Sequence, residues 1–67
     1  MRAGTVKWFH RNSGYGFIRP EDGSEDVFVF YPCIETDGPQ VLNSGQAVFF
    51  ESSESHNGKA ATRVLFA

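Results

Sequence analysis

The strongest constraint on the fold is the spacing of apolar residues, which recur at every second position in two neighbouring segments. In SGYGFI (13–18) and VFVFY (27–31), small or aliphatic residues alternate with aromatic ones instead of with polar ones. A period of two places successive side chains on opposite faces of a β-strand. The long Ala, Leu, Glu and Lys runs that helices favour are missing. The chain is therefore predicted to be all-β.

The rest of the chain fits the same pattern. Five strands are predicted, over residues 5–10, 15–19, 26–31, 47–53 and 60–66, with turn residues at 12–14, 22–23 and 57–58. Asn57-Gly58 is the strongest two-residue hairpin signal. The segment 32–46 is expected to be a long surface loop from which Ile34 and Leu42 tuck back onto the core. Five short strands in 67 residues predict one domain, residues 1–67, folded as a small antiparallel barrel.

Alternation assigns each strand residue to a face of the barrel. One side of the second and third strands carries Tyr15, Phe17, Arg19, Asp26, Phe28 and Phe30, and the other carries Gly16, Ile18, Val27, Val29 and Tyr31. The aliphatic side, together with Val48 and Val64, is the expected interior. A charged residue accompanies the rings in both strands, so the aromatic side is expected to face solvent. Contiguous exposed apolar patches of this size usually mark binding surfaces.

The first strand departs from strict alternation. Val6 and Trp8 would share a side, although Val6 is expected in the core and Trp8 at the surface. A β-bulge near Lys7 would reconcile the two, but the spacing alone does not decide. In the next strand, Gly16 carries no side chain and would let a neighbouring aromatic ring lie close against its backbone.

Charge and cysteine content narrow the functional classes. Six Lys and Arg against eight Asp and Glu give a formal net charge of −2. This charge argues against binding of duplex nucleic acid through an overall positive surface. The single cysteine, Cys33, cannot form an intramolecular disulfide, and no spacing typical of a metal site occurs. No signal-peptide pattern or membrane-length apolar run is visible. We therefore expect a cytoplasmic protein with no cofactor, metal or membrane partner.

Ten of the 67 residues are Phe, Tyr or Trp, which is more than a core of this size needs. The unstacked bases of a single strand suit a flat aromatic patch, since each base on a ring contributes about 1–3 kcal/mol whatever its identity. Cations near strand ends or loops would follow the phosphates: Lys7, Arg11, Arg19 and Lys59. His10 and His56 would add charge below about pH 6.5.

The stretch GTVKWFHRNSGYGFIRPEDGSEDVFVFY resembles the start of a bacterial cold-shock domain. GYGFI and VFVFY resemble the two ribonucleoprotein motifs of that family, and KWF and the later SGQAVFFE extend the likeness over essentially the whole chain. The resemblance implies a five-stranded oligonucleotide/oligosaccharide-binding (OB) barrel that binds single-stranded RNA and DNA as an RNA chaperone or transcription regulator. It also implies a base-stacking set of Trp8, Tyr15, Phe17, Phe28 and Phe30, with Phe9 and Tyr31 at its margin and Lys7 and Asp26 as polar members.

Several positions depart from the family pattern and reduce its electrostatic support. Ser13 stands where Lys is usual, and Phe30 stands where His is usual. Pro39 falls where an aromatic is common, and Gln40 falls where Lys is frequent. Because the stacking residues are kept, we expect binding that is weaker than typical for the family and less sensitive to salt. With about two or three phosphates engaged, log K would fall with log[salt] at a slope of roughly −1.4 to −2.1.

Three alternatives stay open at this point. Small barrels also bind proline-rich peptides through exposed aromatic grooves, and the response of Trp8 fluorescence to thymine-rich or proline-rich ligands would separate the two classes. An enzyme would need Cys33 as nucleophile with His10 or His56 as base, but no paired acid accompanies them, so we expect neither catalysis nor a small-molecule substrate. Two copies could also exchange strands through the loop 32–46, although a monomer is the default expectation.

Overall fold

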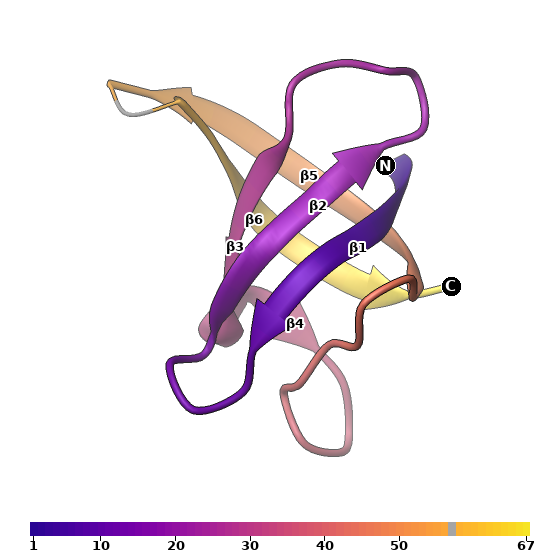
Figure 1. Cartoon of the computed structure of the whole chain (residues 1–67), viewed down its shortest axis with the longest axis vertical. Helices are drawn as coiled ribbons and strands as arrows, with labels where there is room; N and C mark the ends of the chain where they lie inside the picture. Colours follow the sequence, from indigo (N-terminus) through magenta and orange to yellow (C-terminus); the bar gives the residue numbers. More distant parts are fainter. Residues whose placement is uncertain (57) are drawn as a thin grey trace.

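Six β-strands, one of them only two residues long, make up most of the described chain (Figure 1). The computed structural model describes residues 1–56 and 58–67. The strands are β1 (Arg2–His10), β2 (Tyr15–Pro20), β3 (Val27–Phe30), β4 (Ile34–Glu35), β5 (Ala47–Ser55) and β6 (Gly58–Phe66), with a 3₁₀ turn, η1 (Tyr31–Cys33), between β3 and β4. The five predicted strands are confirmed, and Asn57 of the predicted turn lies outside the described residues.

The strands form one sheet that curls until it closes (Figure 1). Antiparallel ladders join β3 to β2, β2 to β1, β1 to β5 and β5 to β6. Closure comes from a parallel pairing of β3 with β6 at Phe28 and Ala60, and β4 also runs parallel to β6. The predicted five-stranded OB-type barrel is confirmed, with a parallel seam that the sequence did not reveal. No helix within the described residues has the length and hydropathy that crossing a bilayer requires.

The inward side of the barrel is aliphatic, as predicted. Among the described residues the almost fully buried side chains are Val6, Ile18, Val27, Val29, Ile34, Leu42, Val48, Phe50 and Val64. Fully burying a side chain of this kind contributes about 1.5–3 kcal/mol, which draws Ile34 and Leu42 from the 32–46 segment onto the core as expected. None of the five rings predicted to stack bases belongs to this set, so the core is complete without them.

A bulge in β1 places Val6 and Trp8 on opposite faces. Val6 pairs with Ile18 of β2, whereas Trp8 pairs with Phe17, so Lys7 is the extra residue between the two pairs. An extra residue shifts the alternation by one position. Val6 is therefore buried and Trp8 faces outward, and the bulge that spacing alone could not decide is confirmed.

Gly16 allows β1 and β2 to approach each other closely beside this bulge. A Cβ at Gly16 would overlap the carbonyl oxygen of Trp8 and would lie 3.1 Å from Cδ1 of Phe9. The first contact is with backbone, which cannot move aside without disturbing the ladder. The ring predicted to lie against Gly16 is therefore that of Phe9, and a side chain at this position would force the two strands apart.

The third strand is shorter than predicted at both ends. Asp26 precedes β3, and Tyr31 begins η1 because Pro32 has a fixed φ and no N–H to extend the ladder. The prediction that Tyr31 points inward was wrong, since its side chain is 45% exposed. Its ring packs over Gly14, where a Cβ would lie 2.7 Å from Tyr31 Cδ1. The segment 32–46 is also not entirely loop, because η1 ends and β4 lies within it.

Candidate nucleic-acid interface

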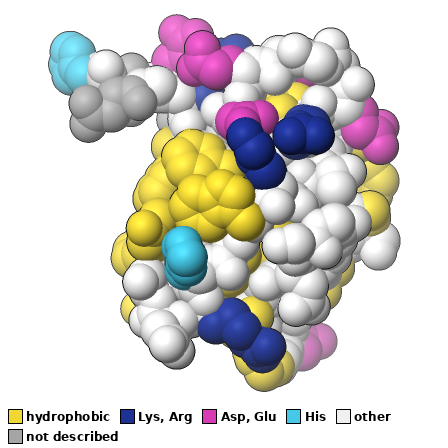
Figure 2. Space-filling model, in the orientation of Figure 1, with side chains coloured by type: hydrophobic (Ala, Val, Ile, Leu, Met, Phe, Trp, Pro, Cys, Tyr) yellow, Lys and Arg dark blue, Asp and Glu magenta, His cyan; other side chains and the backbone are white. Residues whose placement is uncertain are grey.

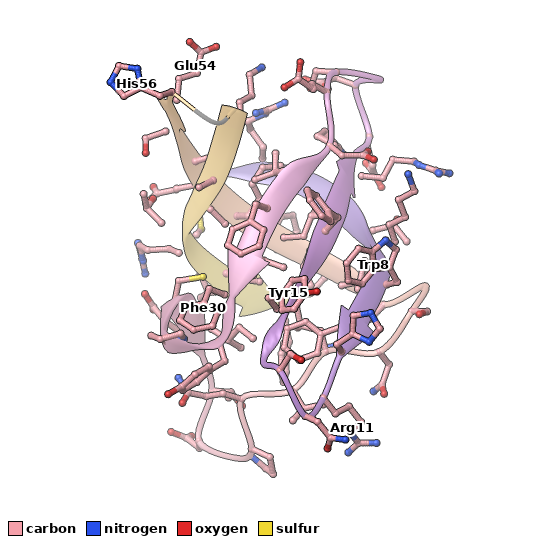
Figure 3. The ribbon with its side chains drawn as sticks, turned by 60° about the vertical axis from the view of Figure 1, so that its left-hand side comes forward. Trp8, Arg11, Tyr15, Phe30, Glu54 and His56 are labelled. Carbon is pink, nitrogen blue, oxygen red and sulfur yellow. The ribbon has the colours of Figure 1, made fainter. Side chains whose placement is uncertain are left out.

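The outward faces of β1, β2 and β3 carry a cluster of aromatic rings, and Figure 2 shows hydrophobic side chains gathered there in one patch with a histidine at its border. The ring centroid of Trp8 is 5.3 Å from that of Phe17 and 5.7 Å from that of Tyr15. The Phe28 centroid is 5.7 Å from Phe17 and 5.9 Å from Tyr15. Phe30 pairs across the strands with Tyr15 (Figure 3). We call Trp8, Tyr15, Phe17, Phe28 and Phe30 the aromatic face.

Edge-to-face contacts fix the orientation of these rings. The interplanar angle is 61° between Trp8 and Phe17 and 75° between Phe17 and Phe28, and such pairs contribute about 0.5–1.5 kcal/mol beyond burial. Phe28 and Phe30 are 36% and 46% exposed, whereas Trp8, Tyr15 and Phe17 are half-buried among their neighbours. The aromatic face is thus a preformed apolar surface whose side chains lose little freedom when a ligand covers it.

The two rings predicted at the margin lie outside this cluster. Phe9 is partly buried and packs against the core, so only the exposed part of its side chain is available to a ligand. Tyr31 contacts Phe30 edge-on, with centroids 5.0 Å apart, and extends the apolar surface beyond the end of β3. His10 joins the cluster, with its ring 4.8 Å from that of Trp8. Its signal in the sequence was the outward position two residues after Trp8.

The basic residues divide into paired and unpaired groups. Arg2, Lys7 and Arg63 form ion pairs with Asp22, Asp26 and Glu35, respectively. Within residues 1–56 and 58–67, no carboxylate lies at ion-pair distance from Arg11, Arg19 or Lys59. Arg19 follows Tyr15 and Phe17 on the outer side of β2, Arg11 lies below Tyr15 in Figure 3, and Lys59 lies beside Phe28. The unpaired cations therefore border the aromatic face.

Lys7 and Asp26, the predicted polar members of the site, neutralise each other. Lys7 Nζ is 2.9 Å from Asp26 Oδ2, and the side chains are 42% and 33% exposed. An ion pair with this much solvent access contributes at most about 1 kcal/mol. Its effect is chiefly positional, because it joins the bulge of β1 to the residue that precedes β3. It also means that Lys7 is not among the unpaired cations.

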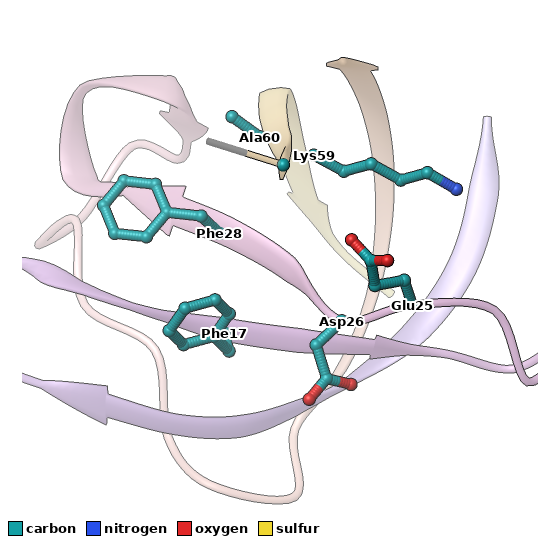
Figure 4. A pocket seen from close by; sticks show the side chains of 7 residues that line it. Phe17, Glu25, Asp26, Phe28, Lys59 and Ala60 are labelled. Carbon is teal, nitrogen blue, oxygen red and sulfur yellow. The ribbon is translucent and has the colours of Figure 1, made fainter. Parts of the chain in front are cut away.

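A pocket adjoins the aromatic face between β3 and the β5–β6 hairpin (Figure 4). Its volume is about 510 Å³, and its lining consists of Phe17, Glu25, Asp26, Phe28, Gly58, Lys59 and Ala60. Two rings form its apolar wall, and two carboxylates and an ammonium group lie at its rim. Sequence reasoning missed Gly58, Ala60 and Glu25 as lining residues, and of these only Glu25 carries a charge. Its only signal was an acidic charge in a turn, which does not differ from that of an ordinary solvated carboxylate.

Comparison with known proteins identifies the family. The 'Cold-shock' DNA-binding domain matches residues 2–66. The chain belongs to the cold-shock domain family. It is similar to the cold shock-like protein CspE of Escherichia coli (strain K12), with 48% identity over 62 residues that cover 92% of this chain and 90% of the relative. It is also similar to the probable cold shock protein A of Mycolicibacterium smegmatis, with 52% identity over 64 residues and 96% of each chain covered.

A solved structure matches the fold of this cold-shock domain. The structure described as drosophila Unr CSD456 aligns with a TM-score of 0.77 at 18% sequence identity. The alignment covers 98% of this chain and 26% of that chain, so the cold-shock domain described here spans about a quarter of the longer chain. The family resemblance and the barrel expected from the sequence are both confirmed.

Arg2 fixes the turn that precedes β3 in this cold-shock domain. Its guanidinium donates to Asp22 Oδ2 at 3.1 Å and to the Ser24 hydroxyl, and its central carbon lies 5.2 Å from the centre of the Phe50 ring. Hydrogen bonds from the Ser24 hydroxyl and backbone N–H, with a smaller contribution from Arg2, lower the pKa of Asp22 to about 2. Glu25 follows this clamped turn directly, so the rim of the pocket has a fixed support.

The Cys33 thiol has a structural role. Its Sγ lies 3.0 Å from the Phe30 carbonyl oxygen, to which it donates, and burial raises the pKa of the thiol. A nucleophilic cysteine needs the opposite shift. Over the described residues, His, Cys, Asp and Glu side chains form no group of three or more that could hold a metal ion. This arrangement offers no activated nucleophile at Cys33.

Proposed function

We propose that this cold-shock domain binds single-stranded RNA and DNA through the aromatic face, with little dependence on sequence. The observation that supports it best is the combination of contiguous, partly exposed rings on three adjacent strands with unpaired cations at their border. Each base stacked on such a ring contributes about 1–3 kcal/mol. Bases inside a duplex stack on one another and cannot lie flat on a protein ring, so single strands are favoured.

The electrostatic part of binding is expected to be modest. Arg11, Arg19 and Lys59 are the basic residues near the aromatic face that form no ion pair with any described residue. If two or three of them each neutralise a phosphate, log K falls with log[salt] at a slope of roughly −1.4 to −2.1. A measured slope steeper than about −4 would contradict this account, because it would require more phosphate contacts than these residues supply.

A protein that covers unpaired bases competes with the folding of a transcript on itself. We therefore propose a role as an RNA chaperone or transcription-regulating protein in the cytoplasm. The domain, residues 1–67, would act as a monomer without catalytic activity or a small-molecule substrate. The site residues proposed for nucleic-acid contact are Lys7, Trp8, Phe9, Tyr15, Phe17, Arg19, Asp26, Phe28, Phe30, Tyr31 and Lys59, with Phe9 and Tyr31 at the margin. Arg11 is added to them as a further candidate for phosphate contact.

The deciding experiment is a titration of Trp8 fluorescence with heptathymidine at low salt. We expect strong quenching by the single strand and weak quenching by a duplex of the same length. Phe17→Ala/Phe28→Ala should weaken binding by at least about thirty-fold. Because Phe17 contacts Trp8, the anisotropy of a labelled oligonucleotide should be recorded in parallel. Phe49→Ala, which removes an exposed ring on another part of the surface, is the matched control.

The same titration tests the peptide-binding alternative. Small barrels that use aromatic grooves for proline-rich segments respond to such peptides and not to oligonucleotides. Absence of quenching by heptathymidine at tens of micromolar, with quenching by a proline-rich peptide, would replace the proposed function with a protein-interaction role.

A further inference from the structure

The pocket beside β3 combines features that the rest of the aromatic face lacks. Phe17 and Phe28 supply its apolar wall, with ring planes 75° apart. A base stacked on one ring would therefore meet the edge of the other and be fixed in rotation as well as in depth. The volume of about 510 Å³ lies within the range of small-molecule sites. This part of the surface can therefore hold one base in a defined orientation.

The rim of the pocket offers an acceptor and a donor that do not satisfy each other. Glu25 forms no ion pair or side-chain hydrogen bond with any residue in the described parts of the chain, and neither does Lys59. Asp26 is committed to Lys7 at 2.9 Å. In Figure 4 the Glu25 carboxylate points toward the side on which Lys59 lies, whereas the Asp26 carboxylate points the other way. Glu25 is thus the free acceptor of the pocket.

The backbone of β6 leaves room for that acceptor. Glu25 Oε1 lies 3.8 Å from the place that a Cβ on Gly58 would occupy. Gly58 has φ +112°, a conformation that favours glycine. The carboxylate therefore lies beside the start of β6, where Gly58 has no side chain to cover it. Because Glu25 is exposed, its oxygens are accessible to the edge of a base held in the pocket.

The chemistry of the four bases then separates them. A carboxylate only accepts hydrogen bonds and can take two parallel ones. Guanine presents two adjacent donors on its Watson–Crick edge, N1–H and the 2-amino group, followed by an acceptor at O6. Uracil and thymine present one N–H between two carbonyls, and adenine and cytosine present one amino group beside an acceptor nitrogen. Guanine alone can satisfy both oxygens of Glu25 while Lys59 donates to O6.

We propose that Glu25, assisted by Lys59, makes this pocket a guanine-selective subsite within an otherwise sequence-tolerant surface. The inference rests on the proposed function, because the base arrives as part of a single strand on the aromatic face. A bidentate contact at a solvent-accessible rim is expected to favour guanine by about five- to ten-fold in Kd, the lower part of the range for such contacts. Glu25 acts here as a specificity residue and is not needed for stacking.

The test compares oligonucleotides that differ at one base. The affinity of heptathymidine is measured beside that of heptamers in which one guanine replaces thymine at each position in turn. We expect one position to bind about five- to ten-fold more tightly than heptathymidine. Adenine at that position controls for the stronger stacking of a purine, and inosine keeps N1–H and O6 but lacks the 2-amino group. Both are expected to lose most of the preference.

Two matched variants locate the effect. Glu25→Gln replaces one acceptor oxygen with a donor, so the preference for guanine should vanish while heptathymidine binds at least as well as before. Glu21→Gln removes the same charge from an exposed residue of the same turn that does not line the pocket, and it should keep the preference.

The outcomes distinguish this inference from the function on which it rests. A guanine preference below two-fold at every position, or one that survives Glu25→Gln, overturns the subsite while leaving ring-dependent binding of heptathymidine intact. If heptathymidine itself fails to bind, the proposed function fails and the subsite fails with it.

Discussion

Two parts of the surface expose phenylalanine to a similar degree but differ in the rings and charged side chains that surround it. Phe28 and Phe30 on the aromatic face are 36% and 46% exposed, and Phe49 and Phe66 on β5 and β6 are 44% and 41% exposed. Phe49 lies in register with Ala3 of β1 and Leu65 of β6. Within the described residues, no ring contact involves Phe49 or Phe66. Exposure of a ring is therefore not what distinguishes the proposed binding surface.

The two surfaces also differ in whether their charged side chains form ion pairs. On the β5–β6 side, Arg63 donates to both carboxylate oxygens of Glu35, at 2.6 and 3.0 Å, and lies 3.7 Å from Glu51. These hydrogen bonds lower the pKa of Glu35 and raise that of Arg63. Around the aromatic face, by contrast, Arg11 and Arg19 have no such partner in the described part of the chain. A binding surface for a polyanion needs clustered rings together with cations that are still free.

The largest effect should come from removing rings from one surface and not from the other. Phe17→Ala/Phe28→Ala deletes two stacking positions and should weaken binding of heptathymidine by at least about thirty-fold, since each ring is worth about 1–3 kcal/mol. Phe49→Ala should change the affinity by less than two-fold. Fluorescence anisotropy measures both, with circular dichroism to confirm that the barrel is folded. Equal losses in the two variants would contradict the distinction between the surfaces.

Neutralising the cations of each surface should distinguish the two surfaces by the salt dependence of binding. The triple variant Arg11→Gln/Arg19→Gln/Lys59→Gln should flatten the slope of log K against log[salt] from roughly −2 to near zero, because each phosphate contact contributes about −0.7 for a single strand. Arg63→Gln removes a cation that is already paired and should leave the slope unchanged. A triple variant whose slope stays near that of the parent would mean that other residues contact the phosphates.

The smallest effect concerns the Arg2 clamp, which connects the core to the turn at the edge of the aromatic face. The folded-state pKa of Asp22, about 2, lies below its ordinary value of 3.8. The stability that it contributes is therefore fully present above about pH 4 and is lost as the pH falls toward 2. Urea unfolding between pH 2 and 6 should show a flatter acid limb for Asp22→Asn than for the parent. Asp37→Asn, which removes an exposed carboxylate outside the clamp, should retain the acid limb.

Alternation was sufficient to predict the faces of β2 and most of β3. Phe28 and Val29 lie on opposite sides as expected, because a pleated strand leaves no other choice. The prediction failed at Tyr31, where the alternation was extended one residue too far. Pro32 ends the ladder there, and the 3₁₀ turn rotates the ring outward. Pro32 was thus a local signal in the sequence for the end of β3.

Other features depend on contacts between distant segments and leave no local signal. Lys7 and Asp26 were both predicted at the site, but their pairing across 19 positions requires the folded register. Which cations are paired and which are unpaired also depends on the folded register. Amino-acid composition counts both kinds alike and therefore cannot separate them. The parallel contact of Phe28 with Ala60 and the short strand β4 arise only when the barrel closes.

That parallel contact has a mechanical consequence. β3 and β6 meet at the pair Phe28 and Ala60, so the seam of the barrel is thin where Phe28 presents its ring to a ligand. A strand of nucleic acid that stacks on Phe28 and contacts Lys59 would lie across the seam and fasten its two sides together. Local opening of β3 would become rarer, and its amide hydrogens would exchange more slowly with solvent. The bound strand would thus stabilise the closed barrel at the β3–β6 seam.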